Sequence, residues 1–156
     1  MKNEEVVKAL IKKNLKITTM ESCTGGLLIS SITDIEGASN ITDGGFVTYS
    51  NKQKISIGVP AETIETYGVY SKETALKMAE VCKAKMKCDI GVGITGTLSN
   101  VDINNSDSKQ GEVYFAIKYL NSKEVIRKIK VPITCRHNQK EFILDNIFEE
   151  LIKIIY

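Results

Sequence analysis

The stretch that organises this chain reads Thr18-Thr19-Met20-Glu21-Ser22-Cys23-Thr24-Gly25-Gly26. An apolar run over residues 15–20 predicts a strand that leads into it, and a helical pattern begins directly after it at Leu27. In α/β folds such a junction often holds reactive groups, because the helix N-terminus carries unpaired N–H donors and a partial positive charge. Ser22 and Cys23 are therefore candidate nucleophiles. The alternative is a strand-to-helix turn in which a Ser or Thr only caps the helix.

Length and composition indicate one globular domain over residues 1–156. Hydrophobic residues make up 42% of the chain and charged residues 26%, as in ordinary folded proteins. The net charge is only +2, and lysines alternate with glutamates along the helices, so we expect no nucleic-acid partner. The apolar runs are too short to span a membrane and the N-terminus is acidic, so we expect a cytoplasmic protein without membrane contact.

The cysteines and acidic residues give no sign of a metal or a disulfide. The four cysteines (Cys23, Cys82, Cys88 and Cys135) contain no C-x-x-C pair, and their spacing fits neither a zinc site nor a disulfide framework. Reduced thiols are the expected state in the cytosol. No His, Asp or Glu cluster has ligand spacing, so the sequence predicts neither a metal nor another cofactor.

Hydrophobic periodicity predicts helices alternating with short strands. Helices are expected over 3–13, 27–33, 51–57, 60–67, a longer segment capped by Ser71, and 137–155. Strands are expected over 15–20, 44–49, 89–95, 112–119 and 124–131, the last two forming a hairpin. The polar loop from 96 to about 110 is long enough to indicate function or mobility. This order predicts an α/β fold, a three-layer α/β/α sandwich with a mixed, mostly parallel sheet.

Ligands of such sheets usually bind beyond the carboxyl ends of the strands. Three expected strand ends carry hydroxyl groups, those of Ser22, Tyr49 with Ser50, and Thr95. A serine nucleophile also needs a base that takes its proton. The single histidine, His137, lies in a polar connection, where a histidine is more often solvated than catalytic.

A lysine is the alternative base, provided that burial or a nearby cation holds it neutral. Lys52 and Lys54 follow the strand end at Tyr49 and lie in a short expected helix. Residues two apart do not share a helix face, so only one of the two can face the site. Spacing alone leaves open which one does, and it also allows both lysines to be solvated.

Several motifs of this chain match those of one family in order and spacing, from about residue 4 to the C-terminus. They are Glu21-Ser22-Cys23-Thr24-Gly25-Gly26, Gly45-Phe46-Val47-Thr48-Tyr49-Ser50-Asn51 with Lys54, Gly58-Val59, Gly68-Val69-Tyr70-Ser71, Thr95-Gly96, and Gly111-Glu112-Val113-Tyr114-Phe115-Ala116. With these motifs the chain resembles the C-terminal amidohydrolase domain of the CinA (competence-damage-inducible) family, which also occurs alone as nicotinamide-nucleotide amidohydrolase.

The resemblance implies hydrolysis of the carboxamide of nicotinamide mononucleotide to nicotinate mononucleotide and ammonia. It implies Ser22 as the nucleophile, working with Tyr49 and Lys54 and assisted by the hydroxyl of Thr95. It also implies a homo-oligomer, with a dimer favoured, and a nucleotide as the small-molecule substrate. The expected substrate-binding residues are Cys23, Thr24, Gly25, Gly26, Gly96 and Arg136. Backbone N–H groups of the turn from Cys23 to Gly26 are the expected oxyanion donors, and the guanidinium of Arg136 suits a phosphate.

The loop 97–109 departs from the family pattern. Where the family has a glycine-rich stretch, this chain has Asn, Asp and Ser residues, among them Asp102 and Asp107. Glycines let a backbone approach a ligand closely, so we expect side chains to obstruct that approach here. The family commonly has Gly-Asp before Arg136, whereas this chain has Thr-Cys. Two alternative functions remain open: an inactive or regulatory nucleotide-binding paralogue, and an amidase for another small amide.

Overall fold

The computed structural model describes residues 1–156 as an α/β fold with a mixed five-stranded sheet and six helices. The strands are β1 (Ile17–Glu21), β2 (Phe46–Val47), β3 (Ile90–Gly96), β4 (Glu112–Tyr119) and β5 (Lys123–Lys130). The helices are α1 (Lys2–Lys13), α2 (Leu27–Thr33), α3 (Asn51–Ile57), α4 (Ala61–Tyr67), α5 (Lys72–Met86) and α6 (Arg136–Ile155), with a short 3-10 turn η1 (Ala38–Asn40).

The sheet has the strand order β2-β1-β3-β4-β5. β1 pairs in parallel with β2 and β3, whereas β3 pairs antiparallel with β4 and β4 with β5. Parallel and antiparallel pairs are thus equal in number, and the sequence-based expectation of a mostly parallel sheet is not met. The reason lies in the connection after β3. The loop 97–111 turns the chain straight back beside β3, where a crossover helix would have been needed for a parallel neighbour.

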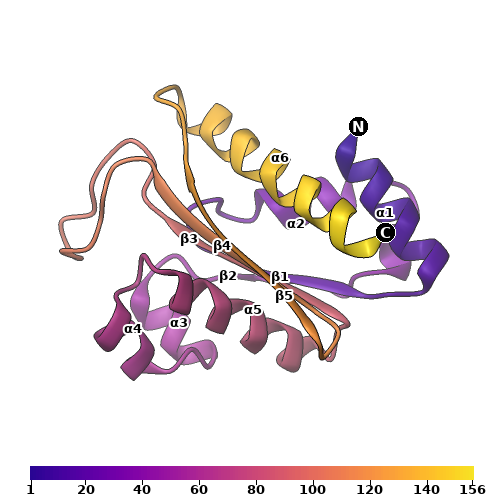
Figure 1. Ribbon diagram of the computed structural model, residues 1–156, viewed down its shortest axis with the longest axis horizontal. Helices are drawn as coiled ribbons and strands as arrows, with labels where there is room; N and C mark the ends of the chain where they lie inside the picture. Colours follow the sequence, from indigo (N-terminus) through magenta and orange to yellow (C-terminus); the bar gives the residue numbers. More distant parts are fainter.

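Helices cover both faces of the sheet (Figure 1). α1, α2 and α6 lie on one face, and α3, α4 and α5 lie on the other, which gives the three layers that the sequence predicts. The largest apolar cluster lies under the first group and includes Val6, Leu10, Leu28 and Ile147. A smaller cluster between the sheet and α5 contains Met20, Met78 and Cys82. None of the helices has both the length and the apolar character needed to cross a membrane.

The glycines of β3 allow α5 to pack directly on the sheet. A Cβ atom at Gly93 would collide with the backbone carbonyl of Ala75, and one at Gly91 would collide with that of Ala79. Glycine at these two positions is therefore what lets the helix backbone approach the strand closely. The carboxyl-terminal end of β3 and the residues just before α5 form part of the wall of the candidate site.

Candidate active site

The turn after β1 is organised by a carboxylate that the sequence analysis did not single out. Glu21 is fully buried, and it accepts hydrogen bonds from the Thr24 hydroxyl (2.6 Å) and from the backbone N–H groups of Leu28 (2.9 Å) and Ile29 (3.0 Å). These two N–H groups belong to the first turn of α2, where no helical acceptor exists. The negative charge also complements the positive end of the helix dipole. One signal in the sequence could have pointed to this role, namely an acidic residue at the end of an apolar strand. A charge buried there needs hydrogen-bond partners nearby.

Gly25 and Gly26 complete this turn with φ values of 61° and 101°, a left-handed backbone that glycine adopts without strain. The Gly25 N–H donates to the carbonyl of Ser22 (3.0 Å). The N–H groups of Cys23, Thr24 and Gly26 make no hydrogen bond within the protein. The turn therefore leaves three free backbone donors in the residues that follow Ser22.

Lys54 is buried next to Ser22. Its side chain is only 1% exposed, and its Nζ donates to the Thr48 carbonyl (2.8 Å) and to Ser22 Oγ (3.0 Å). Burial lowers the pKa of Lys54 from 10.5 to about 8, while the nearby Cys23 and Asp102 act in the opposite direction. A lysine with this pKa is partly neutral near physiological pH. Lys52 is exposed on the other side of α3, so the structure separates the two lysines that spacing left equivalent.

α3 owes its start to Ser50, whose hydroxyl accepts a hydrogen bond from the backbone N–H of Gln53 (3.1 Å). Such an N-cap fixes the first turn of a short helix. The cap places Lys54 one turn further on, pointing back toward the end of β1. The local sequence Ser50-Asn51-Lys52-Gln53-Lys54 therefore aims a single lysine at Ser22.

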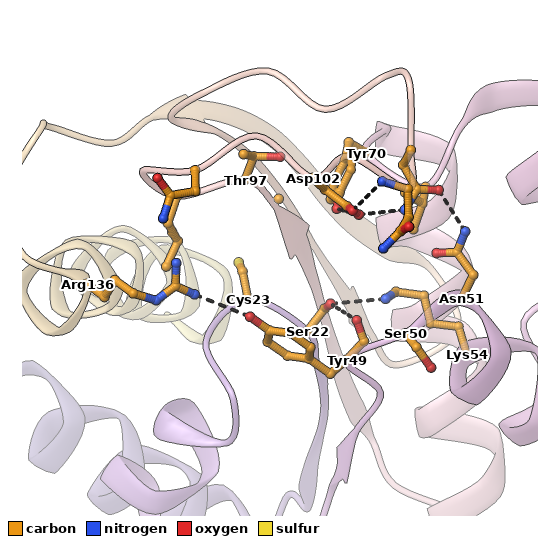
Figure 2. Close-up of a pocket in the computed structure, with 16 residues that line it drawn as sticks. Ser22, Cys23, Tyr49, Ser50, Asn51, Lys54, Tyr70, Thr97, Asp102 and Arg136 are labelled. Atoms are coloured by element: carbon orange, nitrogen blue, oxygen red, sulfur yellow. Dashed lines mark hydrogen bonds between the residues drawn. The ribbon is translucent and has the colours of Figure 1, made fainter.

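Tyr49 presents its backbone, and not its hydroxyl, to Ser22. Ser22 Oγ donates to the Tyr49 carbonyl oxygen at 3.4 Å. The Tyr49 ring is 64% exposed, and its hydroxyl accepts a hydrogen bond from Arg136 Nη2 (3.3 Å). Figure 2 shows this ring directed toward Arg136 and away from Lys54. The structure thus places the Tyr49 hydroxyl at the rim of the site.

Thr95 and Gly96, both expected in the site, lie at the end of β3. Thr95 is buried, and its hydroxyl donates to the backbone carbonyl of Val69 (3.0 Å). Gly96 and the following Thr97 line the cavity described below, whereas Thr95 does not. A Cβ atom at Gly96 would lie 2.6 Å from the Cα of Val113, so this glycine permits the close pairing of β3 with β4.

Cys23 was the rival nucleophile, and its environment suits a thiol and not a thiolate. The side chain is 5% exposed, and burial raises its pKa to about 12. Because the thiolate is the reactive form of cysteine, Cys23 is poorly suited to attack a carbonyl at neutral pH. The single histidine, His137, lies outside the cavity, with its Nε2 3.4 Å from the Glu141 carboxylate.

Ser22 and Lys54 lie in the wall of a cavity of 480 Å³, a volume within the usual range for small-ligand sites. It is lined by Ser22, Cys23, Tyr49, Ser50, Asn51, Lys54, Val69, Tyr70, Gly96, Thr97, Leu98, Asn100, Asp102, Asn104, Asn105 and Arg136. Figure 2 shows Arg136 entering from the start of α6 and Asp102 from the loop 97–111. No group of three or more His, Cys, Asp or Glu residues is arranged to hold a metal ion.

The loop 97–111 is held in place by its own side chains. Asp102 accepts hydrogen bonds from the Tyr70 hydroxyl and from Asn105 Nδ2, both at 2.6 Å. Asn105 in turn accepts one from Asn51 of α3 (2.9 Å), and Asp107 accepts one from the Tyr70 N–H (2.8 Å). The sequence analysis expected side chains to obstruct a glycine-type approach to a ligand. Four of these side chains, from Asn100, Asp102, Asn104 and Asn105, line the cavity.

Arg136 is the first residue of α6 and is exposed at the mouth of the cavity. Lys140 lies one helical turn further along, and a Cβ atom at Gly25 would be 3.6 Å from its Nζ. Two cationic side chains therefore lie beside the turn that carries Ser22. A guanidinium and an ammonium in this arrangement can bind an anionic group of a ligand.

Comparison with known proteins identifies the group to which this arrangement belongs. The family model described as "CinA C-terminal domain" matches residues 1–154. A protein of Clostridioides difficile (strain 630), described as competence-damage inducible, is 40% identical over 126 residues, which is 80% of this chain and 30% of that protein. A CinA-like protein of Kosmotoga olearia is 34% identical over 157 residues, which is 97% of this chain and 38% of that protein. The chain thus spans about a third of the length of these relatives.

Among solved structures, the competence/damage inducible protein CihA from Agrobacterium tumefaciens superimposes with a TM-score of 0.87. Its sequence is 30% identical, and the alignment covers 100% of this chain and 97% of that one. The fold described above is therefore shared along the whole chain with a solved structure.

Proposed function

Because the chain belongs to the CinA C-terminal domain family, we propose that it hydrolyses the carboxamide of nicotinamide mononucleotide to nicotinate mononucleotide and ammonia. One observation carries this proposal: Lys54 Nζ lies 3.0 Å from Ser22 Oγ, and burial lowers the pKa of that lysine to about 8. A serine paired with a partly neutral lysine is a nucleophile with its own base. The pair can therefore cleave an amide without a histidine.

In the proposed reaction the neutral amine of Lys54 takes the proton of Ser22 as Oγ attacks the carboxamide carbon. The tetrahedral intermediate collapses, Lys54 returns the proton to the leaving nitrogen, and ammonia departs. An ester between Ser22 and the nicotinoyl group remains. Water then attacks this ester, again with Lys54 as the base, and releases the carboxylate product.

The free N–H groups of Cys23 and Thr24 are the proposed donors to the oxyanion. The Gly25 N–H is already bonded to the Ser22 carbonyl, which removes one of the donors expected from the turn. The Gly26 N–H is free but lies further from Ser22 along the chain. Losing a single donor of this kind typically costs about 10²–10³ in rate. Glu21 holds the turn in the conformation that leaves these two donors free.

Arg136 and Lys140 are the proposed partners of the substrate phosphate, at the mouth of the cavity. In this arrangement Tyr49 acts as a positioning residue, since its hydroxyl accepts from Arg136 (3.3 Å) and its carbonyl from Ser22. We also propose that Thr95 contributes indirectly, through its bond to Val69 at the cavity wall.

One observation favours a second candidate function, cleavage of a different small amide. The side chains of Asn100, Asp102, Asn104 and Asn105 line the cavity where the family resemblance implies a glycine-rich loop, so they can select another substrate. The deciding experiment measures ammonia release from nicotinamide mononucleotide, from free nicotinamide, and from the deamidated nucleotide as a blank.

Release from the nucleotide alone supports the proposed reaction, provided that Ser22→Ala abolishes it and Cys23→Ser does not. Release from nicotinamide but not from the nucleotide would favour the second candidate. If no amide in the panel releases ammonia while calorimetry detects nucleotide binding, the chain is a binding module and the proposed reaction is wrong.

A further inference from the structure

The cavity is lined by a carboxylate as well as by cationic side chains, and this carboxylate has no role in the reaction proposed above. Asp102 lines the same cavity as Ser22, Lys54 and Arg136. In Figure 2 Arg136 reaches the cavity from α6, whereas Asp102 reaches it from the loop 97–111 on the Lys54 side. A ligand in this cavity therefore meets positive charge at the mouth and negative charge beside the catalytic lysine.

The carboxylate of Asp102 is fixed in position. Its Oδ2 accepts hydrogen bonds from the Tyr70 hydroxyl and from Asn105 Nδ2, and its Oδ1 accepts one from the backbone N–H of Asn104 (2.9 Å). The bond from Tyr70 lowers the pKa of Asp102 below its usual value, so the group is ionised at neutral pH. Asn105 is also tied to Asn51, one turn before Lys54 on α3. The position of the Asp102 carboxylate is thus fixed by hydrogen bonds within the loop 97–111 and, through Asn105, by the helix α3 that carries Lys54.

Arg136 lies at the mouth of the cavity, and Lys54 is the cation whose charge lowers the pKa of Asp102. The carboxylate in turn raises the pKa of that lysine. The proposed reaction, however, uses Lys54 in its neutral form. In the reactive complex Asp102 then lacks a counter-charge within the protein. The substrate can supply one, because the ring that bears the carboxamide of nicotinamide mononucleotide is a pyridinium cation. Attack by Ser22 on the carboxamide carbon places this ring beside Lys54, in the cavity that Asp102 also lines.

We propose that Asp102 is a specificity-determining residue that recognises the positive charge of the ring attached to the scissile carboxamide. The proposal rests on the proposed function for the position of the carboxamide. The cationic ring pairs with the negative charge of Asp102. Its positive charge also lowers the pKa of the nearby Lys54 and so favours the neutral form of that lysine. Amides of uncharged rings receive neither benefit, so the site selects cationic carboxamides over neutral ones of the same size.

The test compares two ligands that differ in ring charge. Nicotinamide mononucleotide and its reduced dihydro form share the phosphate, the ribose and the carboxamide, but only the first has a charged ring. Dissociation constants are measured by calorimetry with Ser22→Ala as the parent, so that neither ligand is consumed. We expect the parent to bind the oxidised form about tenfold more tightly, the size of one screened charge pair, and Ser22→Ala/Asp102→Asn to lose this preference.

Asp107→Asn is the matched control. It makes the same change of charge in the same loop, at a carboxylate that bonds to the Tyr70 N–H but does not line the cavity. Added to the parent, it should keep the preference. Equal binding of the two ligands by the parent overturns the proposal, even if the Asp102 variant does not fold. So does a preference that survives Asp102→Asn, or one that Asp107→Asn removes equally.

The outcome is separable from that of the proposed function, because it is read from binding and not from turnover. If wild-type protein releases no ammonia but the charge preference depends on Asp102, the recognition stands and the hydrolysis fails. If ammonia is released but Asp102→Asn leaves the preference unchanged, the hydrolysis stands and the recognition fails.

Discussion

Raising the pH through about 8 converts Lys54 from an ammonium to an amine, and we expect ammonia release to rise with this conversion. Burial is the main cause of the lowered pKa. Cys23 and Asp102 raise it when they are charged, and over the relevant range only Asp102 is. Cys23 itself has a pKa of about 12, so it stays a thiol over the relevant range. Lys54 is then the group on the free enzyme that governs the acidic limb of the profile.

The size of the effect follows from the neutral fraction. A group with a pKa of about 8 is roughly one-tenth neutral at pH 7 and roughly half neutral at pH 8. The value of kcat/KM should therefore increase roughly fivefold between pH 7 and pH 8, and roughly twofold more on the plateau above pH 9. The substrate phosphate titrates near pH 6 and does not contribute above pH 7.

Initial rates of ammonia release, measured at constant ionic strength from pH 6.5 to 9.5, give this profile directly. Asp102→Asn should move its inflection to lower pH, because Asp102 raises the pKa of Lys54. Lys54→Arg should abolish the reaction, since a guanidinium stays protonated throughout. A flat profile for the wild type, or an inflection that Asp102→Asn moves upward, would refute the reasoning.

Three further outcomes are expected. Lys54→Met should raise the free energy of unfolding at pH 7 by about 2 kcal/mol in urea denaturation, somewhat less than the roughly 3 kcal/mol implied by the depressed pKa, since the Thr48 carbonyl loses its donor. Between pH 8 and 10.5 Lys54 binds more protons in the unfolded state than in the folded one, so the free energy of unfolding of the wild type should rise over that window. The stability gain of Lys54→Met over the wild type should disappear over the same window. Glu21→Ala should lower the melting temperature and destabilise the fold by about 2–4 kcal/mol, because buried N–H donors of α2 lose their acceptor. Arg136→Gln should raise the KM for the nucleotide at least tenfold and leave the KM for the corresponding riboside unchanged.

Most of the fold could be predicted from the sequence. The apolar periodicity placed α3 at residues 51–57 and β4 at 112–119, as the structure has them, because burial on one face imposes a regular spacing. The proportion of parallel strands could not be predicted in this way. It depends on where β4 returns in space, and the loop before it carries no periodic signal.

The candidate site was predicted less completely, because the direction of a side chain depends on tertiary contacts. Spacing marked Lys52 and Lys54 equally, and only the packing of α3 buries one of them. Glu21 was read as part of a motif, although its carboxylate organises the whole turn. The side chains of the loop, Asp102 among them, were expected only to obstruct the approach of a ligand. Hydrogen bonds from Tyr70 and Asn105 hold the Asp102 carboxylate in the cavity that Lys54 also lines, and no spacing in the sequence predicts these contacts.

The central claim is that Lys54 activates Ser22, and one matched pair of variants tests it most directly. Lys54→Met and Lys52→Met make the same substitution two residues apart on α3, one at the buried amine beside Ser22 and one on the exposed side. We predict that kcat/KM for ammonia release from nicotinamide mononucleotide falls at least about 10³-fold in Lys54→Met. It should stay within twofold of the wild type in Lys52→Met. Comparable activity of both folded variants would contradict the account.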